Sequence, residues 1–322
     1  MARTRLYRKG VLEATDFPVE QVSDHLQDPT AVVWLDLCDP AEAGLDVIRE
    51  ELGLHALAVE DALAEHQRPK LDRYATHAFL AVYAVKTDEH TGQLSKSEIN
   101  AFVTPNALVT VHKDDFDMDA VAQRWDSSAD LAKGGVGFLL HGLLDGVVDG
   151  HLVAAQALDD RIEAMEDQLF DDRLPHPDVQ RRALRLRKSL LSLRRVVMPM
   201  REVLSSLMHR DHHIVDDAMM PYFQDVYDHV LFAWEWVESL RELVTTLRET
   251  QLNLQGNRMN NIMKKVTSWA AIIAVPTAIT GFYGQNVPYP GYSAAWGFWV
   301  SAASIVVVSG GLYALFKRRD WL

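Results

Sequence analysis

The chain has 322 residues, a formal net charge of −13 and a single cysteine, Cys38. The charge is uneven, because residues 262–322 carry a net charge of +4, which leaves −17 for the first 261 residues, and residues 266–316 contain no Asp, Glu, Lys or Arg. An acidic body repels nucleic-acid phosphates, and one cysteine excludes a disulfide framework or a cysteine-based zinc site. The composition therefore predicts an acidic cytosolic body joined to an apolar membrane segment, with no nucleic-acid partner.

Residues 1–130 are predicted to form a cytosolic α/β domain. Four compact β-rich runs read as strands, at residues 32–37, 79–85, 99–103 and 107–112. Thr104-Pro105-Asn106 predicts a hairpin turn between the last two, and helical stretches at 41–52 and 56–65 separate the first two. Strands interleaved with helices predict a sheet that helices cover on at least one face. The basic N-terminal residues lack the apolar core of a signal peptide.

Residues 131–265 are predicted to form a cytosolic helical region that ends in a stalk helix. Helices are expected at 136–171 and 178–208, and Pro221 suits the first turn of a third. Apolar residues then advance strictly by four and three positions, which predicts a heptad seam of Val226, Val230, Ala233, Val237, Leu240, Val244 and Leu247. The same spacing continues through Asn253, Asn257 and Asn260. We therefore expect one helix from about residue 222 to about residue 282, roughly 90 Å long.

Two C-terminal apolar runs are each long enough to cross a bilayer. They occupy residues 266–283 and 294–316, and the short segment 284–293 joins them. Lysines precede the first run, and the tail 317–322 that follows the second is basic. The positive-inside rule places both basic flanks, and so both termini, in the cytosol, with 284–293 as the outer loop.

The first span carries small and hydroxylated residues along roughly one face: Thr267, Ala270, Ala274, Thr277 and Gly281. Close helix packing by itself accounts for such a stripe, and so does a narrow hydrated pore. Its continuity with the three asparagines favours the pore, because amides that face lipid or a dry core are costly. Two helices cannot enclose a channel, so any pore must lie on the symmetry axis of an oligomer.

The loop sequence Tyr283-Gly284-Gln285-Asn286, placed between two C-terminal spans and ahead of the basic tail, resembles the CorA family of magnesium channels, whose signature there is Tyr-Gly-Met-Asn. Further similar segments are Glu65-His66-Gln67-Arg68-Pro69-Lys70, Pro199-Met200-Arg201-Glu202-Val203-Leu204 and Pro221-Tyr222-Phe223-Gln224-Asp225-Val226-Tyr227-Asp228-His229. The resemblance covers essentially the whole chain. It implies an α+β fold, with a cytosolic α/β domain, a long stalk helix and two transmembrane helices that form a funnel-shaped homopentamer in the inner (plasma) membrane.

The resemblance also assigns an ion pathway. The Gly284 carbonyl and the Asn286 amide would form an outer ring of neutral oxygens, which suits Mg²⁺ because this ion sheds its water reluctantly. Positions further along the pathway match Asn260, Met263, Val266, Ala274 and Thr277, and the small-residue stripe adds Thr267. Gln285 departs from the signature methionine and leaves the choice between magnesium, cobalt, nickel and zinc open.

Regulatory Mg²⁺ sites follow from the same resemblance. Asp88 and Asp225 match positions that bind Mg²⁺ between neighbouring subunits, and Glu249 matches an acidic stalk position. Bound ions would hold the channel shut. The leading hypothesis is thus a passive Mg²⁺ channel, not an enzyme, that cytosolic Mg²⁺ gates. A zinc transporter of the same fold and a non-conducting membrane-anchored sensor or scaffold are the alternatives.

Two other groups of residues are interpreted without a functional role. His209, His212 and His213, with Asp211, Asp216 and Asp217, fall between two predicted helices and are expected in a solvated loop. A run of arginines on the helix 178–208 faces many carboxylates and is expected to form salt bridges, at Arg181, Arg182, Arg185, Arg187, Arg194 and Arg195.

Overall fold

The computed structural model describes residues 2–40, 42–64, 67–88, 90–113, 116–127, 131–170, 179–211, 213–285, 288–292 and 294–322. The chain divides into two compact units, Met1–Thr246 and Leu247–Leu322, which are called the N-terminal and C-terminal units below.

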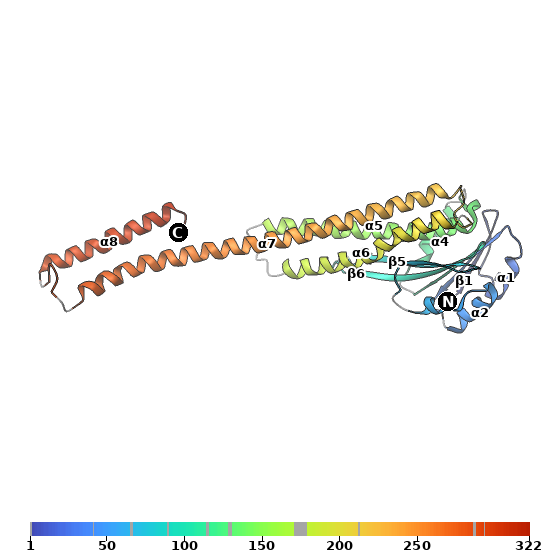
Figure 1. The fold of residues 1–322 in the computed structure, drawn as a ribbon, viewed down its shortest axis with the longest axis horizontal. Helices are drawn as coiled ribbons and strands as arrows, with labels where there is room; N and C mark the ends of the chain where they lie inside the picture. Colours follow the sequence, from blue (N-terminus) through green and yellow to red (C-terminus); the bar gives the residue numbers. More distant parts are fainter. Residues whose placement is uncertain are drawn as a thin grey trace. The chain divides into compact units, whose positions relative to one another are not determined.

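The N-terminal unit is built on one seven-stranded sheet (Figure 1). Its strands are β1 (Ala2–Arg8), β2 (Val11–Thr15), β3 (Ala31–Cys38), β4 (Lys70–Arg73), β5 (Ala78–Thr87), β6 (Leu94–Val103) and β7 (Ala107–His112). The strand order is β2-β1-β3-β7-β6-β5-β4, and only the β3–β7 pair is parallel. The predicted hairpin between β6 and β7 is confirmed, since Ala101 pairs antiparallel with Thr110.

Helices cover both faces of this sheet. The helical elements before α5 are η1 (Val19–Gln21), α1 (Val22–His25), α2 (Glu42–Leu52), α3 (Ala56–Leu63), α4 (Met118–Ser127) and η2 (Ala132–Gly134). On one face, Leu45 and Ile48 of α2 and Ala58 of α3 pack with sheet residues such as Phe79 and Phe102. On the other face, α5 (Gly135–Phe170) packs against β5, with α6 (Val179–Arg210) and α4 beside it. The predicted covered sheet is therefore confirmed, with a helical layer on each side.

The long stalk helix is confirmed as α7 (Met220–Tyr283), close to its predicted bounds of about 222 and 282. Its heptad seam is buried along the whole predicted run from Val226 to Leu247. The asparagines that continue the spacing, Asn253, Asn257 and Asn260, are all exposed. Gln251, four residues after Leu247, is still buried, so the burial of this face of α7 ends between Gln251 and Asn257. The final helix, α8, spans Ala295–Arg318.

Strands β1, β2 and β4 were not expected. In β1, only Thr4, Leu6 and Tyr7 are buried, and arginines occupy three of the other positions, so apolar alternation is weak. Arginine side chains at Arg3, Arg5 and Arg8 form ion pairs with Asp119, Asp126 and Glu13. Pairing with β3 along its full length, and not hydrophobic periodicity, therefore makes this basic segment a strand.

Candidate functional site

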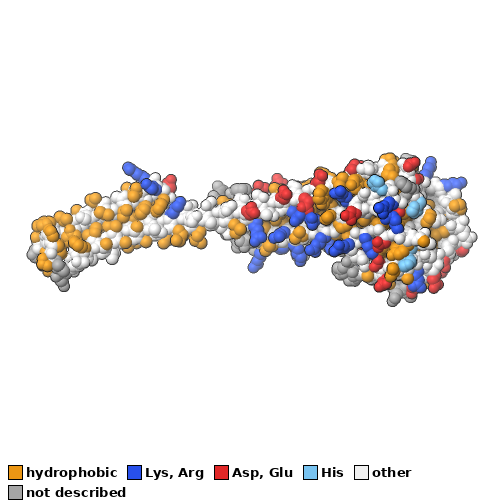
Figure 2. All heavy atoms as spheres, viewed as in Figure 1, with side chains coloured by type: hydrophobic (Ala, Val, Ile, Leu, Met, Phe, Trp, Pro, Cys, Tyr) orange, Lys and Arg blue, Asp and Glu red, His pale blue; other side chains and the backbone are white. Residues whose placement is uncertain are grey.

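Among the residues that the structure describes, three helices are long and apolar enough to cross a membrane: Ala132–Gln168, Met220–Tyr283 and Ala295–Arg318. The most apolar 18-residue stretch of the helix Ala132–Gln168 is 61% buried within the protein, because α5 packs on the sheet. The most apolar 18-residue stretches of α7 and α8 are only 6% and 0% buried. Apolar surface that the protein itself does not cover requires another apolar environment. Figure 2 shows these apolar side chains gathered over the far end of α7 and over α8.

The predicted pore-lining residues on α7 share one exposed face. Asn260, Met263, Val266, Thr267, Ala274 and Thr277 are all exposed. At 100° per residue they fall within an arc of about 120° on the helix surface. The buried Ser268 and the half-buried positions 272, 275, 276 and 279 fall on the opposite side of α7. The structure thus gives the span one covered side, and the predicted pore residues lie on the other.

Hydroxyl groups on the first span bond back to their own helix. The Thr277 hydroxyl donates to the Ile273 carbonyl at 3.1 Å, and the Thr280 hydroxyl donates to the Pro276 carbonyl at 2.8 Å. Pro276 lies inside α7 and has no N–H to donate. Because each hydroxyl proton is used within the helix, the oxygen lone pairs that remain face outward as acceptors. Such oxygens suit the hydrogens of a hydrated cation.

The loop after α7 is closed by aromatic contacts and short turns. The Gly284 N–H donates to the Thr280 carbonyl at 2.8 Å, and the Gln285 N–H donates to the Phe282 carbonyl at 3.3 Å. The Tyr289 hydroxyl returns to the Tyr283 carbonyl at 2.9 Å, and the two rings meet edge to face. Within the described residues, nothing donates a hydrogen bond to the Gly284 carbonyl. Asn286, the other member of the predicted outer ring, lies outside the described residues.

A hollow of about 580 Å³ lies at the start of the first span. It is lined by Asn257, Asn260, Asn261, Met263, Lys264, Thr267 and Trp321. Three of these, Asn260, Met263 and Thr267, belong to the predicted pathway, and Trp321 comes from the C-terminal tail, where it stacks on Phe316. The C-terminal unit therefore brings the basic tail next to the predicted pathway.

The predicted regulatory carboxylates lie at separate places. Asp88 begins the turn between β5 and β6, where its Oδ1 accepts from the Thr91 hydroxyl at 2.6 Å and from the His90 N–H at 3.1 Å. These hydrogen bonds, the one from Thr91 foremost, lower the pKa of Asp88. Asp225 and Glu249 are exposed on α7. Sequence reasoning identified the three positions but could not show that Asp88 caps its own turn.

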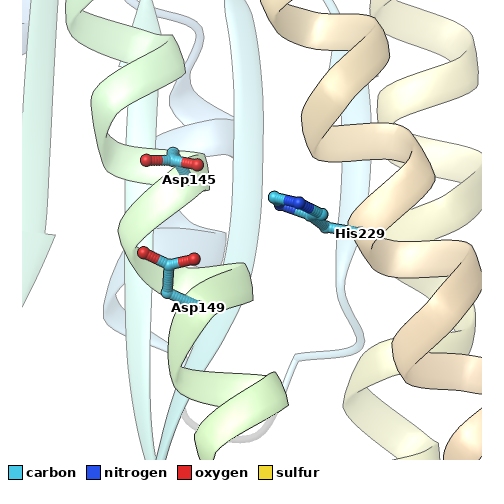
Figure 3. A group of neighbouring side chains, drawn as sticks. All are labelled: Asp145, Asp149 and His229. Atoms are coloured by element: carbon cyan, nitrogen blue, oxygen red, sulfur yellow. The ribbon is translucent and has the colours of Figure 1, made fainter.

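One charged cluster escaped sequence reasoning. Asp145 and Asp149, one turn apart on α5, approach His229 on α7, and one polar atom from each lies within 4.8 Å of the others (Figure 3). The Arg124 guanidinium already bridges the two carboxylates, at 2.8 Å from Asp145 and 2.6 Å from Asp149. Burial, and then repulsion from Asp149, raises the pKa of Asp145. Two i, i+4 spacings, Asp145–Asp149 and Asp225–His229, were the available signal.

The histidine–aspartate group at the end of α6 agrees with the expected solvated loop in that His209, His213, Asp216 and Asp217 are exposed, and Asp211 differs from it. Asp211 is only 2% exposed and pairs with the Arg73 guanidinium of β4. His209 belongs to the last turn of α6, and its Nδ1 lies 2.7 Å from the Ser205 carbonyl. His212 lies outside the described residues. Asp211 therefore ties α6 to the edge of the sheet, a role that its position near polar neighbours did not suggest.

Comparison with known proteins places the chain in a family. A family model described as CorA-like Mg²⁺ transporter protein matches residues 29–318. The chain belongs to this family. The cobalt/magnesium transport protein CorA of Thermotoga maritima is 30% identical over 97% of this chain and 90% of its own length. The zinc transport protein ZntB of Yersinia pestis is 26% identical over 82% of this chain and 80% of its own length.

The fold of a CorA protein is also shared. The complete structure of the CorA magnesium transporter from Methanocaldococcus jannaschii superposes with a TM-score of 0.80. It covers 100% of this chain and 99% of its own, at 24% sequence identity. The α/β domain, the long helix and the two apolar C-terminal helices are therefore the CorA architecture, and the chain is a membrane protein.

Proposed function

We propose that this CorA-family chain forms a homopentameric, passive channel that carries Mg²⁺, and also Co²⁺ or Ni²⁺, across the inner (plasma) membrane. Both termini lie in the cytosol. The residues 1–130 form the cytosolic α/β domain, 131–265 the helical region and stalk, 266–283 and 294–316 the two spans, 284–293 the outer loop and 317–322 the basic tail. The observation that carries the proposal is the uncovered face of α7, on which the predicted pathway residues lie together.

The face of α7 supports an axial pore. An exposed stripe that includes Asn260 and Thr277 would meet lipid if the chain were alone, and the Asn260 amide would then lack hydrogen-bond partners. Five copies around an axis would place this stripe against water and ions instead. Met263 and Val266, which are 57% and 61% exposed, would close the axis as a hydrophobic constriction when the channel is shut.

The outer ring would consist of Gly284, Gln285 and Asn286 from each subunit. The Gly284 carbonyl, to which no described residue donates a hydrogen bond, and two amide side chains offer neutral oxygens. Neutral oxygens hold the hydration shell of Mg²⁺ without the tight binding of a carboxylate ring. Repetition around the axis would multiply each contact and give the ring its affinity.

The cytosolic body would sense the transported ion. Asp88, Asp225 and Glu249 are exposed carboxylates of an acidic surface, and exposed oxygens are ligands that Mg²⁺ accepts. Bound Mg²⁺ between neighbouring subunits would neutralise facing carboxylates and hold the closed state. Loss of the ion would restore repulsion and favour opening.

Asn286→Ala tests the conducting role. In a strain that requires external magnesium, the wild-type gene should restore growth at low Mg²⁺, and the variant should not. Tyr313→Phe, on α8 and outside the proposed pathway, is the matched control and should restore growth. Equal rescue by Asn286→Ala at equal membrane abundance would overturn the pathway assignment. A wild-type protein that conducts no ion would instead favour the non-conducting sensor or scaffold.

Zinc transport is the second candidate, because a zinc transport protein is among the relatives and Gln285 departs from the usual methionine. Flux of Mg²⁺, Co²⁺, Ni²⁺ and Zn²⁺ into liposomes that contain the purified protein separates the two, with and without a pH gradient. We expect Mg²⁺ flux that the gradient does not change, because residues 266–316 contain no Asp, Glu or His to carry protons. Zn²⁺ flux that follows the gradient would favour the second candidate. Gln285→Met in the same assay measures how far this residue sets the preference.

A further inference from the structure

Salt bridges were expected for the six arginines singled out on α6, and one of them forms an ion pair within the described residues. Among Arg181, Arg182, Arg185, Arg187, Arg194 and Arg195, only Arg194 forms an ion pair within the described residues, with Glu238. Arg182 donates to the Gln168 amide oxygen at 2.8 Å, and Arg185 and Arg187 are exposed. Figure 2 shows Lys and Arg side chains gathered along the part of the molecule where Figure 1 places α6. Among the residues that the structure describes, the other five arginines therefore have no carboxylate partner.

Two of these arginines line a pocket of about 220 Å³ in the N-terminal unit. Its walls come from the β5–β6 turn, α5 and α6, and its lining residues are His90, Thr91, Arg161, Ala164, Met165, Gln168, Arg182, Arg185 and Leu186. The contributions of α5 and α6 follow helical spacings of three and four, so each helix turns one face to the pocket. Of the nine lining residues that the structure describes, none carries a carboxylate.

The acidic residues of α5 do not face this pocket. Glu163, Glu166 and Asp167 are exposed but occupy positions between the lining residues Arg161, Ala164, Met165 and Gln168. The apolar lining is instead buried, since Met165 is 4% and Leu186 is 6% exposed. The pocket therefore has an apolar floor and a basic rim, although the protein as a whole is acidic.

The rim is held in place before any ligand binds. The Arg161 guanidinium donates to the Asp88 carbonyl at 3.0 Å, and a Cβ on Gly92 would lie 2.6 Å from its Nη1. The φ of +70° at Gly92 favours glycine there, and a side chain at this position would displace the Arg161 guanidinium. The Ser189 hydroxyl donates to the Gly92 carbonyl at 2.8 Å, which fastens the turn to α6. Fixed guanidinium groups lose less freedom when they bind.

We propose that this pocket binds a phosphate group of a small cytosolic anion. Guanidinium groups match phosphate oxygens with two parallel hydrogen bonds, and the side chains of His90 and Gln168 add neutral donors, whereas the Thr91 hydroxyl is already donated to Asp88. Arg182 and Arg185 also lie in the first two turns of α6, where the helix dipole favours a negative charge. The site lies outside the proposed ion pathway, and its binding is measured without ion flux. The result of the binding test therefore does not depend on whether the protein conducts ions.

Titration calorimetry on the purified full-length protein tests the site, with orthophosphate, pyrophosphate and ATP in separate arms. EDTA is present so that metal complexes do not form. We expect a dissociation constant below about 1 mM for at least one arm, and roughly tenfold or greater weakening in Arg182→Gln/Arg185→Gln. Arg187→Gln/Arg195→Gln removes the same charge from exposed positions of the same helix and should bind as the wild type does.

Orthophosphate binding with this dependence on the variants would assign the site to a free phosphate ion. Binding of pyrophosphate and ATP without binding of orthophosphate would assign the site to a ligand that contains a phosphoanhydride. Circular dichroism melting of each variant shows that it is folded. No saturable binding below about 1 mM in any arm, or equal weakening in both double variants, would overturn the proposal.

Discussion

Buried titratable residues in the sheet link the stability of the N-terminal unit to pH. Asp36 is fully buried and His112 is 4% exposed. The Asp36 carboxylate accepts from the Thr110 hydroxyl at 2.7 Å and lies 3.2 Å from His112 Nε2. Nδ1 of His112 lies 2.6 Å from the Lys113 carbonyl. Both ring nitrogens therefore face acceptors, an arrangement that only the doubly protonated ring satisfies.

This geometry sets the pKa of His112. Burial by itself lowers that pKa, but the hydrogen bond and the attraction to Asp36 outweigh it, so the pKa lies above the ordinary 6.5. Because the pKa of His112 is higher in the folded state than in the unfolded state, protonation of its ring stabilises the fold. This stabilisation is fully present below pH 6.5 and is lost as the pH rises through the folded-state pKa. Acidification within the range near neutrality therefore strengthens this part of the sheet.

His112→Gln should lower the melting temperature most at mildly acidic pH. We expect a loss of about 1–3 kcal/mol near pH 6, or several degrees, because the Asp36 carboxylate loses one charged partner and keeps only Arg3, at 3.4 Å. The difference from the wild type should shrink as pH rises above neutrality. Tryptophan fluorescence reports the transition, since Trp34 and Trp125 pack edge to face in this core. His213→Gln, at an exposed position, is the control, and a pH-independent difference would contradict the assignment.

At the scale of elements, glycines in α5 let the neighbouring helix and loop approach it closely. A Cβ on Gly142 would lie 2.4 Å from Nε1 of Trp125 on α4, whose N–H donates to the Leu139 carbonyl. A Cβ on Gly137 would lie 2.2 Å from the Ile214 carbonyl oxygen. On the same helix, a Cβ on Gly146 would have no neighbour nearer than 3.9 Å. Gly137 and Gly142 are thus packing positions, and none of the three glycines ends the helix.

The two glycine positions should respond in opposite directions to alanine. Gly142→Ala should destabilise the N-terminal unit by about 1–3 kcal/mol, because the buried Trp125 must move. Gly146→Ala should stabilise it by up to about 1 kcal/mol, because alanine favours a helix and has space there. Thermal unfolding followed by circular dichroism measures both. Destabilisation of equal size at both positions would show that the contact with Trp125 does not control the effect.

At the scale of the whole molecule, the proposed pentamer makes a prediction about accessibility. Ala274 lies on the exposed face of α7, and Ile279 lies on the half-buried side. In a Cys38→Ser background, a positively charged methanethiosulfonate should reach Ala274→Cys from the water-filled axis and reduce divalent-cation flux by about tenfold. Ile279→Cys should keep its flux after the same treatment. Block through Ile279→Cys with none through Ala274→Cys would require a different face for the pathway.

Sequence periodicity located most elements because their signals are local. Heptad spacing gave α7 to within two residues of its ends, and alternation and hairpin signals gave β3, β5, β6 and β7. It missed β1, whose arginines interrupt the apolar pattern and find carboxylates more than 100 residues away. For the candidate site, periodicity placed Asn260, Thr277 and their neighbours on one helix face, and the structure left that face uncovered.

By itself, the sequence determined that this is an acidic protein with two apolar C-terminal runs and a long helix before them, because charge, length and helical period depend only on neighbouring residues. The tertiary structure alone decided which distant groups meet: Asp211 with Arg73, the Asp145–Asp149 pair with His229, and the arginines of α6 with the β5–β6 turn. Those contacts depend on how sheet and helices pack, which is a property of the whole N-terminal unit. No local sequence pattern predicts these contacts.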